Sequence, residues 1–156
     1  MSAPTVTGSG VSVLVSERSA ESGAGMTVVE PVPVHQTAVL TRGNFRHDDD
    51  AIVPAFQRLT DACREANPDV VLIHQLYHVG QHGDADNSFA PNWSPSGLPS
   101  YHDADGSHAM TEPEIDEVIA GFVAGARRAQ AAGFDGIEIF AAYNALVDQF
   151  WTPWSN

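Results

Sequence analysis

The sequence predicts an α/β fold in which parallel strands alternate with helices. Three short apolar runs, each bounded by polar or Gly- and Pro-containing segments, favour buried strands: Met26 to Val29, Val70 to Ile73 and Ile137 to Phe140. A continuous apolar run of this length is typical of a strand that is covered on both faces. Helical patterns separate the runs, so right-handed crossovers should join parallel strands in a barrel or in an open doubly wound sheet.

Two amphipathic helices are predicted between these strands. The first carries apolar residues at helical spacing between Ile52 and Cys63, and Asn67-Pro68 ends it. The second begins with a capping box, because Thr111 can accept the N–H of Glu114 while the Glu114 carboxylate accepts the N–H of Thr111. Gly133 is expected to stop this helix.

One domain is expected over residues 16–156, preceded by a poorly defined tail over residues 1–15. The tail is small and polar, and Val11 to Val15 is its candidate for a short strand. The stretch from Gly80 to Met110 is rich in Gly, Pro, Ser, Asn and Asp and is longer than most passive connections. We therefore expect it to be an active-site or interface loop.

Charge and composition exclude several kinds of function. The 156 residues include 7 basic residues, all arginine, and 20 acidic residues, for a formal net charge of -13. Chemistry that needs a lysine, such as a Schiff base or a P-loop, is therefore excluded. So acidic a surface repels nucleic acid and anionic membranes, and no apolar run reaches the roughly 18 residues of a membrane span. Cys63 has no partner for an internal disulfide, and we expect a cytoplasmic protein.

Candidate functional residues lie where the predicted strands end. In both parallel architectures, chemistry collects at the carboxyl ends of the strands. Those ends are Glu30-Pro31, Gln75 to His78 and Phe140 to Tyr143. We therefore expect the functional site to be built from these three segments.

A histidine cluster offers an alternative chemistry. His74, His78 and His82 are spaced by four residues, which on a helix would align them to bind zinc. The residues from Val70 to Leu76 favour a strand, however, and Gly80 would break a helix. We therefore expect no metal site, and a metal-dependent hydrolase that uses these histidines stays as a second alternative function.

Several segments form a pattern that is more specific than any one of them. One is His74 to Gly80, His-Gln-Leu-Tyr-His-Val-Gly, and another is Ala129 to Ile139, Ala-Gln-Ala-Ala-Gly-Phe-Asp-Gly-Ile-Glu-Ile, followed by Asp148-Gln149-Phe150. The others are Gly25 to Glu30, Ala90-Pro91 with Ser94-Pro95-Ser96, Met110 to Ile115, Pro153 and Asn156. Taken in their order along the chain, these segments resemble the old yellow enzyme and NADH:flavin oxidoreductase family, whose strand-end signature is Gln-Leu-aromatic-His-Ala-Gly-Arg.

This resemblance implies a TIM (β/α)8 barrel that binds FMN. A nicotinamide cofactor, NADH or NADPH, would reduce the flavin, and an activated alkene or related small-molecule substrate would reoxidise it. The resemblance assigns Gln75 to the flavin ring, where an amide suits the isoalloxazine edge because it both donates and accepts. It also implies that the backbone near Glu30 and Pro31 borders the ring.

Three positions depart from the family pattern. Where the family carries a His-x-x-His or His-x-x-Asn pair for the substrate carbonyl, this chain has Phe140 and Tyr143. Phe140 cannot donate a hydrogen bond, whereas Tyr143 can polarise an oxygen or contact an amine, as in the trimethylamine dehydrogenase branch. We expect both over the reacting face of the ring, with Tyr77 and His78 lining the pocket. Gln81 replaces an arginine, which removes a positive charge expected at the rim.

The resemblance covers only part of such a barrel. A complete barrel has eight β/α units over roughly 250 residues, whereas about three units and a long active-site loop are predicted here. Open sheet edges and apolar helix faces would favour self-association or a complementary chain that completes the barrel. The leading interpretation is an FMN-dependent NAD(P)H oxidoreductase in truncated or split form. The first alternative is a non-catalytic half-barrel remnant or interaction module.

Overall fold

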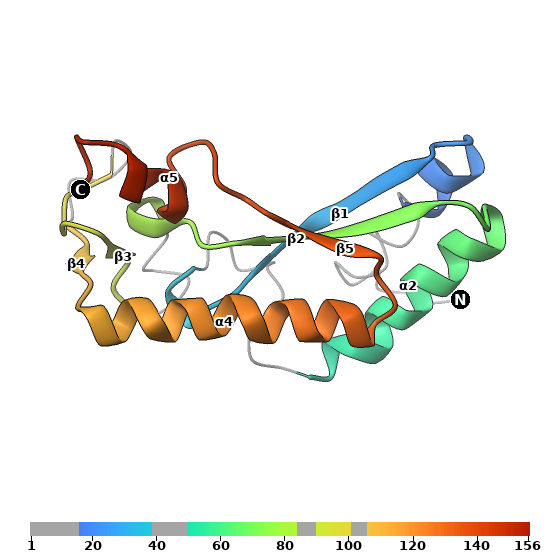
Figure 1. The fold of residues 1–156 in the computed structure, drawn as a ribbon, viewed down its shortest axis with the longest axis horizontal. Helices are drawn as coiled ribbons and strands as arrows, with labels where there is room; N and C mark the ends of the chain where they lie inside the picture. Colours follow the sequence, from blue (N-terminus) through green and yellow to red (C-terminus); the bar gives the residue numbers. More distant parts are fainter. Residues whose placement is uncertain (1–15, 39–49, 84–89, 101–105) are drawn as a thin grey trace, which may run out of the picture.

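The computed structural model describes residues 16–38, 50–83, 90–100 and 106–156 (Figure 1). The predicted tail and its candidate strand, Val11 to Val15, lie outside the described residues. A short helix spans residues 16–21. The elements after it are β1 (Met26–Pro33), the 3-10 helix η1 (Gln36–Ala38), α2 (Ile52–Ala66), β2 (Val71–Tyr77), the 3-10 helix η2 (Gly80–His82), β3 (Trp93–Ser94), β4 (His108–Ala109), α4 (Glu112–Ala131), β5 (Gly136–Ile139) and α5 (Leu146–Trp151).

The three predicted strands form one parallel sheet in the order β1-β2-β5. Strand order therefore follows chain order, with α2 between β1 and β2 and α4 between β2 and β5. Both helices pack on the same face of β2, since Phe56 of α2 contacts His74 and Gly125 of α4 lies against Leu76. Helices on one face and strands in sequential order are the arrangement of a barrel segment, whereas an open doubly wound sheet has helices on both faces.

Two strands extend further than the sequence predicted. β1 continues through Glu30 and Pro31 to Pro33, and β2 continues through Gln75 to Tyr77, where we expected loops to begin. The pairing of β1 with β2 shifts register between Val29 and Val32, which accommodates proline in the ladder although it has no N–H to donate. The polar residues did not mark strand ends because the sheet face opposite the helices carries polar side chains.

The main core lies between the sheet and α2. Phe56, Leu59 and Cys63 of α2 pack against Val29 and Leu72 of the sheet, and all five side chains are almost fully buried. Cys63 is completely buried, and its burial raises the pKa of the thiol above its usual value. Cys63, on the apolar face of α2, is therefore a core residue.

Helix α4 begins with the predicted capping box. The Glu114 carboxylate accepts the backbone N–H of Thr111 at 2.7 Å, and the reciprocal bond is present. The Thr111 N–H and the imidazole of His108 hold the pKa of Glu114 at about 2. Further along α4, a Cβ on Gly121 would overlap the carbonyl oxygen of Val34, so glycine lets the helix approach the segment after β1.

The segment predicted as a long loop contains local structure. β3 and β4 form a two-residue parallel ladder in which Trp93 pairs with His108. The hydroxyl groups of Ser94 and Ser107 hydrogen-bond at 2.7 Å beside it. Residues 84–89 and 101–105 of this segment lie outside the described residues. None of the helices in the described part of the chain is long and apolar enough to cross a lipid bilayer.

Buried histidines predict acid sensitivity of the fold. His74 lies between the rings of Phe56 and Phe134, at 4.8 and 4.7 Å, and burial lowers its pKa to about 4. Because the unfolded chain binds protons near the usual pKa of 6.5 and the folded chain does not, stability should fall as pH falls from 6.5 toward 4. Each such histidine contributes up to about 1.4 kcal/mol per pH unit in this range.

The variant His74→Phe tests this dependence. Among the described residues Nδ1 of His74 has no hydrogen-bond partner, so phenylalanine should keep or raise stability at pH 7.5. Urea unfolding at pH 7.5 and pH 5 should show a smaller loss for the variant than for the native chain. An equal loss in both proteins would contradict the assignment of His74 as a buried neutral group.

Candidate functional site

The candidate site lies at the edge of the sheet where β1, β2 and β5 reach their carboxyl ends. Pro33 pairs with Tyr77, and Leu76 pairs with Ile139, so the last residues of the three strands lie side by side. Phe140 follows β5 directly and donates its backbone N–H to the carbonyl of Leu76 at 2.9 Å. The three predicted segments therefore meet at one edge, as parallel pairing requires.

Alternation along β2 places Gln75 on the face opposite the helices. Leu72, His74 and Leu76 are buried toward α2 and α4, with 0 to 3% of each exposed. Successive side chains of a strand point to opposite faces, so Gln75 faces away from the helices and is only half-buried. In a barrel this face is the interior.

Gln75 has a side-chain partner on the neighbouring strand. Its register partner on β5 is Glu138, and the Gln75 amide Nε2 donates to Glu138 Oε2 at 3.0 Å. The two side chains thus form a polar pair on the face that the described helices leave open. Gln75 lies within β2 rather than at its exit, which corrects the predicted position by about two residues along the strand.

The residues predicted from the first strand lie beside Gln75 on β1. Glu30 is exposed and Pro31 is half-buried, and both fall at the register shift between Val29 and Val32. Irregularities of this kind often lie next to functional sites, because they redirect side chains and free backbone groups from the ladder. Glu30 and Pro31 are therefore part of the strand wall and not of a loop beyond it.

His78 is an internal hydrogen-bonding group in the structure. Only 1% of the residue is exposed, and its Nδ1 accepts the backbone N–H of Gly80 at 3.0 Å. Its Nε2 lies 3.0 Å from Oγ1 of Thr37, which follows β1. Thr37 Oγ1 lies 2.8 Å from Nδ1 of His35, and His35 Nε2 lies 3.0 Å from Oε1 of Glu117 on α4.

These contacts determine which ring nitrogen of each histidine carries its proton. Nδ1 of His78 accepts a backbone N–H, so the His78 proton is on Nε2 and is donated to the Thr37 hydroxyl. The hydroxyl then donates to Nδ1 of His35, whose own proton is on Nε2 and faces Glu117. Burial, and to a smaller extent the neighbouring His35 imidazole, lower the pKa of His78 to about 3, which keeps it neutral. The network ties the end of β2 to the segment after β1 and to α4.

Phe140 and Tyr143 differ in their surroundings. Phe140 is half-buried directly after β5, whereas Tyr143 is 83% exposed. Tyr143 and Asn144 have backbone φ angles of 61° and 56°, in the left-handed region. Non-glycine residues seldom adopt this conformation, and strain of this kind clusters at functional sites. The backbone N–H of Asn144 donates to the Asp148 carboxylate at 2.9 Å, which supports the turn.

Helix α5 is fastened to the end of β2 by Gln149. The Gln149 side chain is fully buried, accepts the backbone N–H of Gln81 and donates to the carbonyls of Val79 and Asn144. Gly80 has a φ of 67°, and a Cβ there would overlap the Gln149 amide. Only glycine therefore fits between β2 and this contact.

Gln81 does not lie at the rim of the site. Only 2% of the residue is exposed, so the expectation that this position sets the charge at the rim is wrong. The chain turns inward through η2, because Gly80 takes the left-handed conformation and Gln149 holds the backbone of Gln81.

The histidine cluster does not assemble in the described part of the chain. His74 faces two phenylalanine rings and His78 faces Thr37, so their side chains serve separate contacts. No group of three His, Cys, Asp or Glu side chains suited to a metal ion occurs among the described residues. The hydrolase alternative has no support in this geometry.

Comparison with known proteins assigns the chain to a family. Residues 6–156 match the model of the NADH:flavin oxidoreductase / NADH oxidase family. The chain belongs to this family. Family members use FMN, with NADH or NADPH as the reductant. The expected cofactors and the family resemblance are thus confirmed at the level of the family.

Similar proteins support the assignment and are much longer. The chain is 34% identical to the metal reductase of Desulforamulus reducens over 137 residues, which are 88% of this chain and 20% of that protein. It is 31% identical to the NADPH dehydrogenase of Listeria innocua, over 88% of this chain and 39% of that protein. The old yellow enzyme homologue from Zymomonas mobilis matches with a TM-score of 0.79 and 26% identity, over 92% of this chain and 42% of that structure. The fold is therefore part of a TIM barrel, as predicted.

Sequence reasoning missed several residues that build the edge. Glu138 was treated only as part of an apolar strand, although a carboxylate inside such a run is a signal that one face is open. Thr37 and His35 carry no sequence signal, since their role depends on contacts with residues about 40 and 80 positions away. Gln149 was noted for resemblance alone and is in fact the anchor of α5.

Thr37→Val tests the buried network. Valine has nearly the same shape but provides no hydroxyl, so Nε2 of His78 would lose its acceptor and Nδ1 of His35 its hydroxyl donor. We expect a loss of about 1–3 kcal/mol in the free energy of unfolding, measured with urea at pH 7.5. The control Thr37→Ser keeps the hydroxyl and should lose much less. Equal stability of the two variants would show that the network does not stabilise the fold.

Proposed function

We propose that this chain forms the flavin-ring side of an FMN-dependent NAD(P)H oxidoreductase of the old yellow enzyme type. The observation that supports it most directly is the position of the Gln75 amide, on the open face of β2 and near its carboxyl end. An amide there can hydrogen-bond the edge of an isoalloxazine ring. Glu30 and Pro31 on β1 would border the ring on one side.

The described residues fit the ring better than the phosphate of FMN. The arginines that the structure describes all lie on helices: Arg18 in the helix over residues 16–21, Arg58 and Arg64 on α2, and Arg127 and Arg128 on α4. None of these follows a strand. In barrels of this type the phosphate site uses loops after the seventh and eighth strands, so we propose that other β/α units bind the phosphate.

On the substrate side we propose roles for Phe140 and Tyr143. When bound, FMN supplies the hydride and electron transfer between nicotinamide and substrate. Tyr143 provides a hydroxyl that can donate to a substrate oxygen or contact an amine, and Phe140 provides an apolar surface. His78, with both ring nitrogens engaged, would act by holding the end of β2 in place.

Flavin titration of the chain tests the proposal. FMN fluorescence should be quenched on addition of the chain, and Gln75→Ala should weaken the affinity by about 2- to 10-fold for each hydrogen bond lost. The control Gln130→Ala removes an exposed glutamine on α4 and should have no effect. Absence of any flavin binding by the native chain would favour the non-catalytic half-barrel alternative for the chain by itself.

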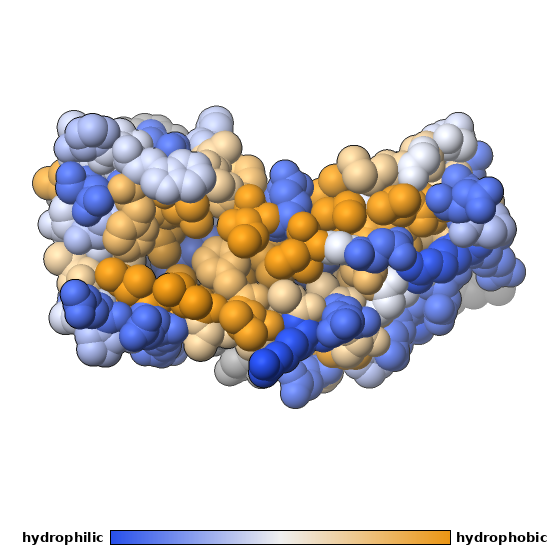
Figure 2. Space-filling model, in the orientation of Figure 1, coloured by the Kyte–Doolittle hydropathy of each residue, from blue (hydrophilic) through white to orange (hydrophobic). Residues whose placement is uncertain are grey.

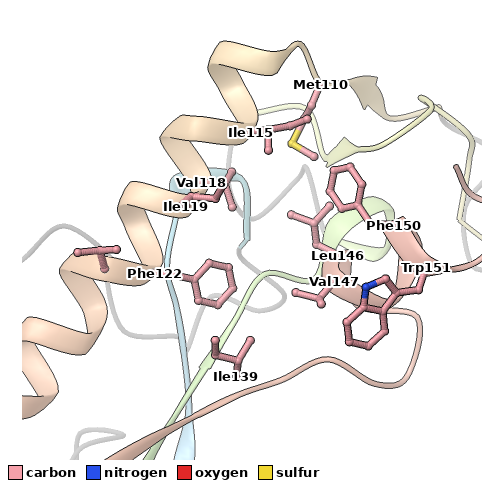
Figure 3. A pocket seen from close by; sticks show the side chains of 11 residues that line it. Met110, Ile115, Val118, Ile119, Phe122, Ile139, Leu146, Val147, Phe150 and Trp151 are labelled. Carbon is pink, nitrogen blue, oxygen red and sulfur yellow. The ribbon is translucent and has the colours of Figure 1, made fainter.

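An apolar groove lies on the helix side of β5. Figure 2 shows a band of hydrophobic residues along α4 and beneath α5, and Figure 3 shows side chains of the two helices facing each other across it. The groove has a volume of about 510 Å³ and is lined by Met110, Ile115, Val118, Ile119, Phe122, Val123, Ile139, Leu146, Val147, Phe150 and Trp151. Ile119 and Ile139 are 54 and 50% exposed, whereas Leu76, beside Ile139 on β2, is 1% exposed.

We propose that further β/α units of the barrel cover this groove, either on the same polypeptide or on a complementary chain. β2 has a strand on each side in the described sheet, but β5 has one only toward β2, and its helix-side residues lack the cover that α2 and α4 give to β2. A parallel strand beside β5 would pair with its open edge, and an amphipathic helix after that strand would cover the exposed apolar residues on the helix side of β5. The Listeria innocua and Zymomonas mobilis proteins are more than twice as long as this chain, which supports the same occupant.

Self-association of the 156-residue chain tests the groove. We expect concentration-dependent oligomers in sedimentation velocity, because the exposed apolar surface favours association. Ile119→Glu places a charge in the groove and should shift the chain toward monomer, whereas Ala120→Glu, at an exposed position outside the groove lining, should not. A native chain that stays monomeric at all concentrations would contradict the proposal.

A further inference from the structure

We infer that Glu138 is a positioning residue that sets which end of the Gln75 amide meets the flavin ring. The inference rests on the proposed flavin site and adds a function for a carboxylate that has no role in it so far. Glu138 is the register partner of Gln75 on the neighbouring strand, so a side chain in this place is always close to the Gln75 amide.

The direction of the hydrogen bond follows from the chemistry of the two groups. An ionised carboxylate can only accept hydrogen bonds, while the amide has a donor end and an acceptor end. Nε2 of Gln75 must therefore face Glu138, and in the structure it donates to Oε2 of Glu138 at 3.0 Å. Two described arginines have their ion pairs elsewhere, Arg64 with Asp135 and Arg128 with Asp50.

Fixing Nε2 on the side of β5 fixes the other end of the amide as well. The amide group is planar, so Oε1 points away from Glu138. One N–H of Nε2 is used by Glu138, which leaves Oε1 as an acceptor and the second N–H as a donor for a ligand. The pyrimidine edge of a flavin offers an N–H between two carbonyl groups. Oε1 of Gln75 can accept from that N–H, and the second N–H of Nε2 can donate to a carbonyl. The fixed orientation of the amide therefore allows only one orientation of the flavin edge.

An exposed pair of this kind can also be a mere surface contact that contributes little. The two possibilities differ in what replacement of Glu138 by glutamine does. The substitution Glu138→Gln keeps the size of the side chain, but the new amide can pair with either end of the Gln75 amide. It therefore removes the preference for one orientation while a hydrogen bond between the strands can still form.

The first measurement uses the flavin-free chain. In a 15N-labelled sample, the signals of the Gln75 side-chain amide protons should change in Glu138→Gln, because the acceptor of one N–H is no longer a carboxylate. The matched control Glu65→Gln removes the same charge from α2, away from the sheet edge, and should leave the Gln75 signal unchanged. Identical Gln75 amide signals in the native chain and in Glu138→Gln would overturn the inference.

The second measurement is the affinity for two flavins. Riboflavin has the same ring as FMN but no phosphate, so a local change of charge affects it less. We expect Glu138→Gln to weaken binding of riboflavin and FMN by a similar factor, about 2- to 10-fold, with no change for Glu65→Gln. A change for FMN alone would mean that Glu138 acts on the phosphate by charge, and unchanged affinity for both would mean that it does not position Gln75.

The two proposals fail in different ways. If the native chain binds neither flavin, the proposed flavin site in this chain is wrong, while the amide signals still report whether Glu138 orients Gln75. If flavin binds with the native chain and Glu138→Gln equally well, the flavin site stands and the role of Glu138 is rejected.

Discussion

The parallel pairing of β1, β2 and β5 is the constraint on which the other features depend. It brings the three strand ends to one edge and gives β2 two different faces. Side chains on one face, such as Leu72 and Leu76, are buried under the two crossover helices. Those on the other face, such as Gln75, are available for polar contacts. A register slip of one residue in β2 would exchange these two sets and remove both the core and the site.

At the carboxyl ends of the strands, the buried polar groups differ from the accessible ones in the partners they bind. His78, Thr37 and His35 lie inside and use their polar atoms on one another or on the backbone, which is the condition for burying them. Gln149 does the same for the junction with α5. Gln75 and Glu138 are instead accessible, and the amide keeps unused donor and acceptor capacity. The buried network thus holds the strand ends together, and the accessible pair leaves donor and acceptor groups on the open face.

The exposed apolar residues of β5 and α4 follow from the same parallel strand arrangement as the candidate site. A barrel covers each strand with two neighbouring strands and with helices on the outside, and in the described residues only β2 has this full environment. β5 has the sheet on one side only, and Ile137 and Ile139 are 39 and 50% exposed on its helix side. The apolar groove along α4 is therefore the expected contact surface of a neighbouring β/α unit, and its chemistry is that of a protein interior.

The sequence by itself determined the strands of the main sheet, the two helices between them and the family. Apolar runs located all three strands, spacing located α2, and the capping box placed the start of α4 at the correct residue, because each of these signals depends on near neighbours in the chain. The matched motifs predicted the partial barrel and the FMN family. Strand ends were less certain, since polar residues such as Glu30 and Gln75 belong to strands when one face is open.

Tertiary structure decided the arrangement of the site. The hydrogen bond between Gln75 and Glu138 depends on the register of two strands whose residues are 63 positions apart. The burial of Gln81 and the engagement of both nitrogens of His78 depend on contacts with Gln149 and Thr37, which no local pattern predicts. Local signals fix which residues form helices and strands, whereas the partners of polar side chains are fixed by how those elements pack.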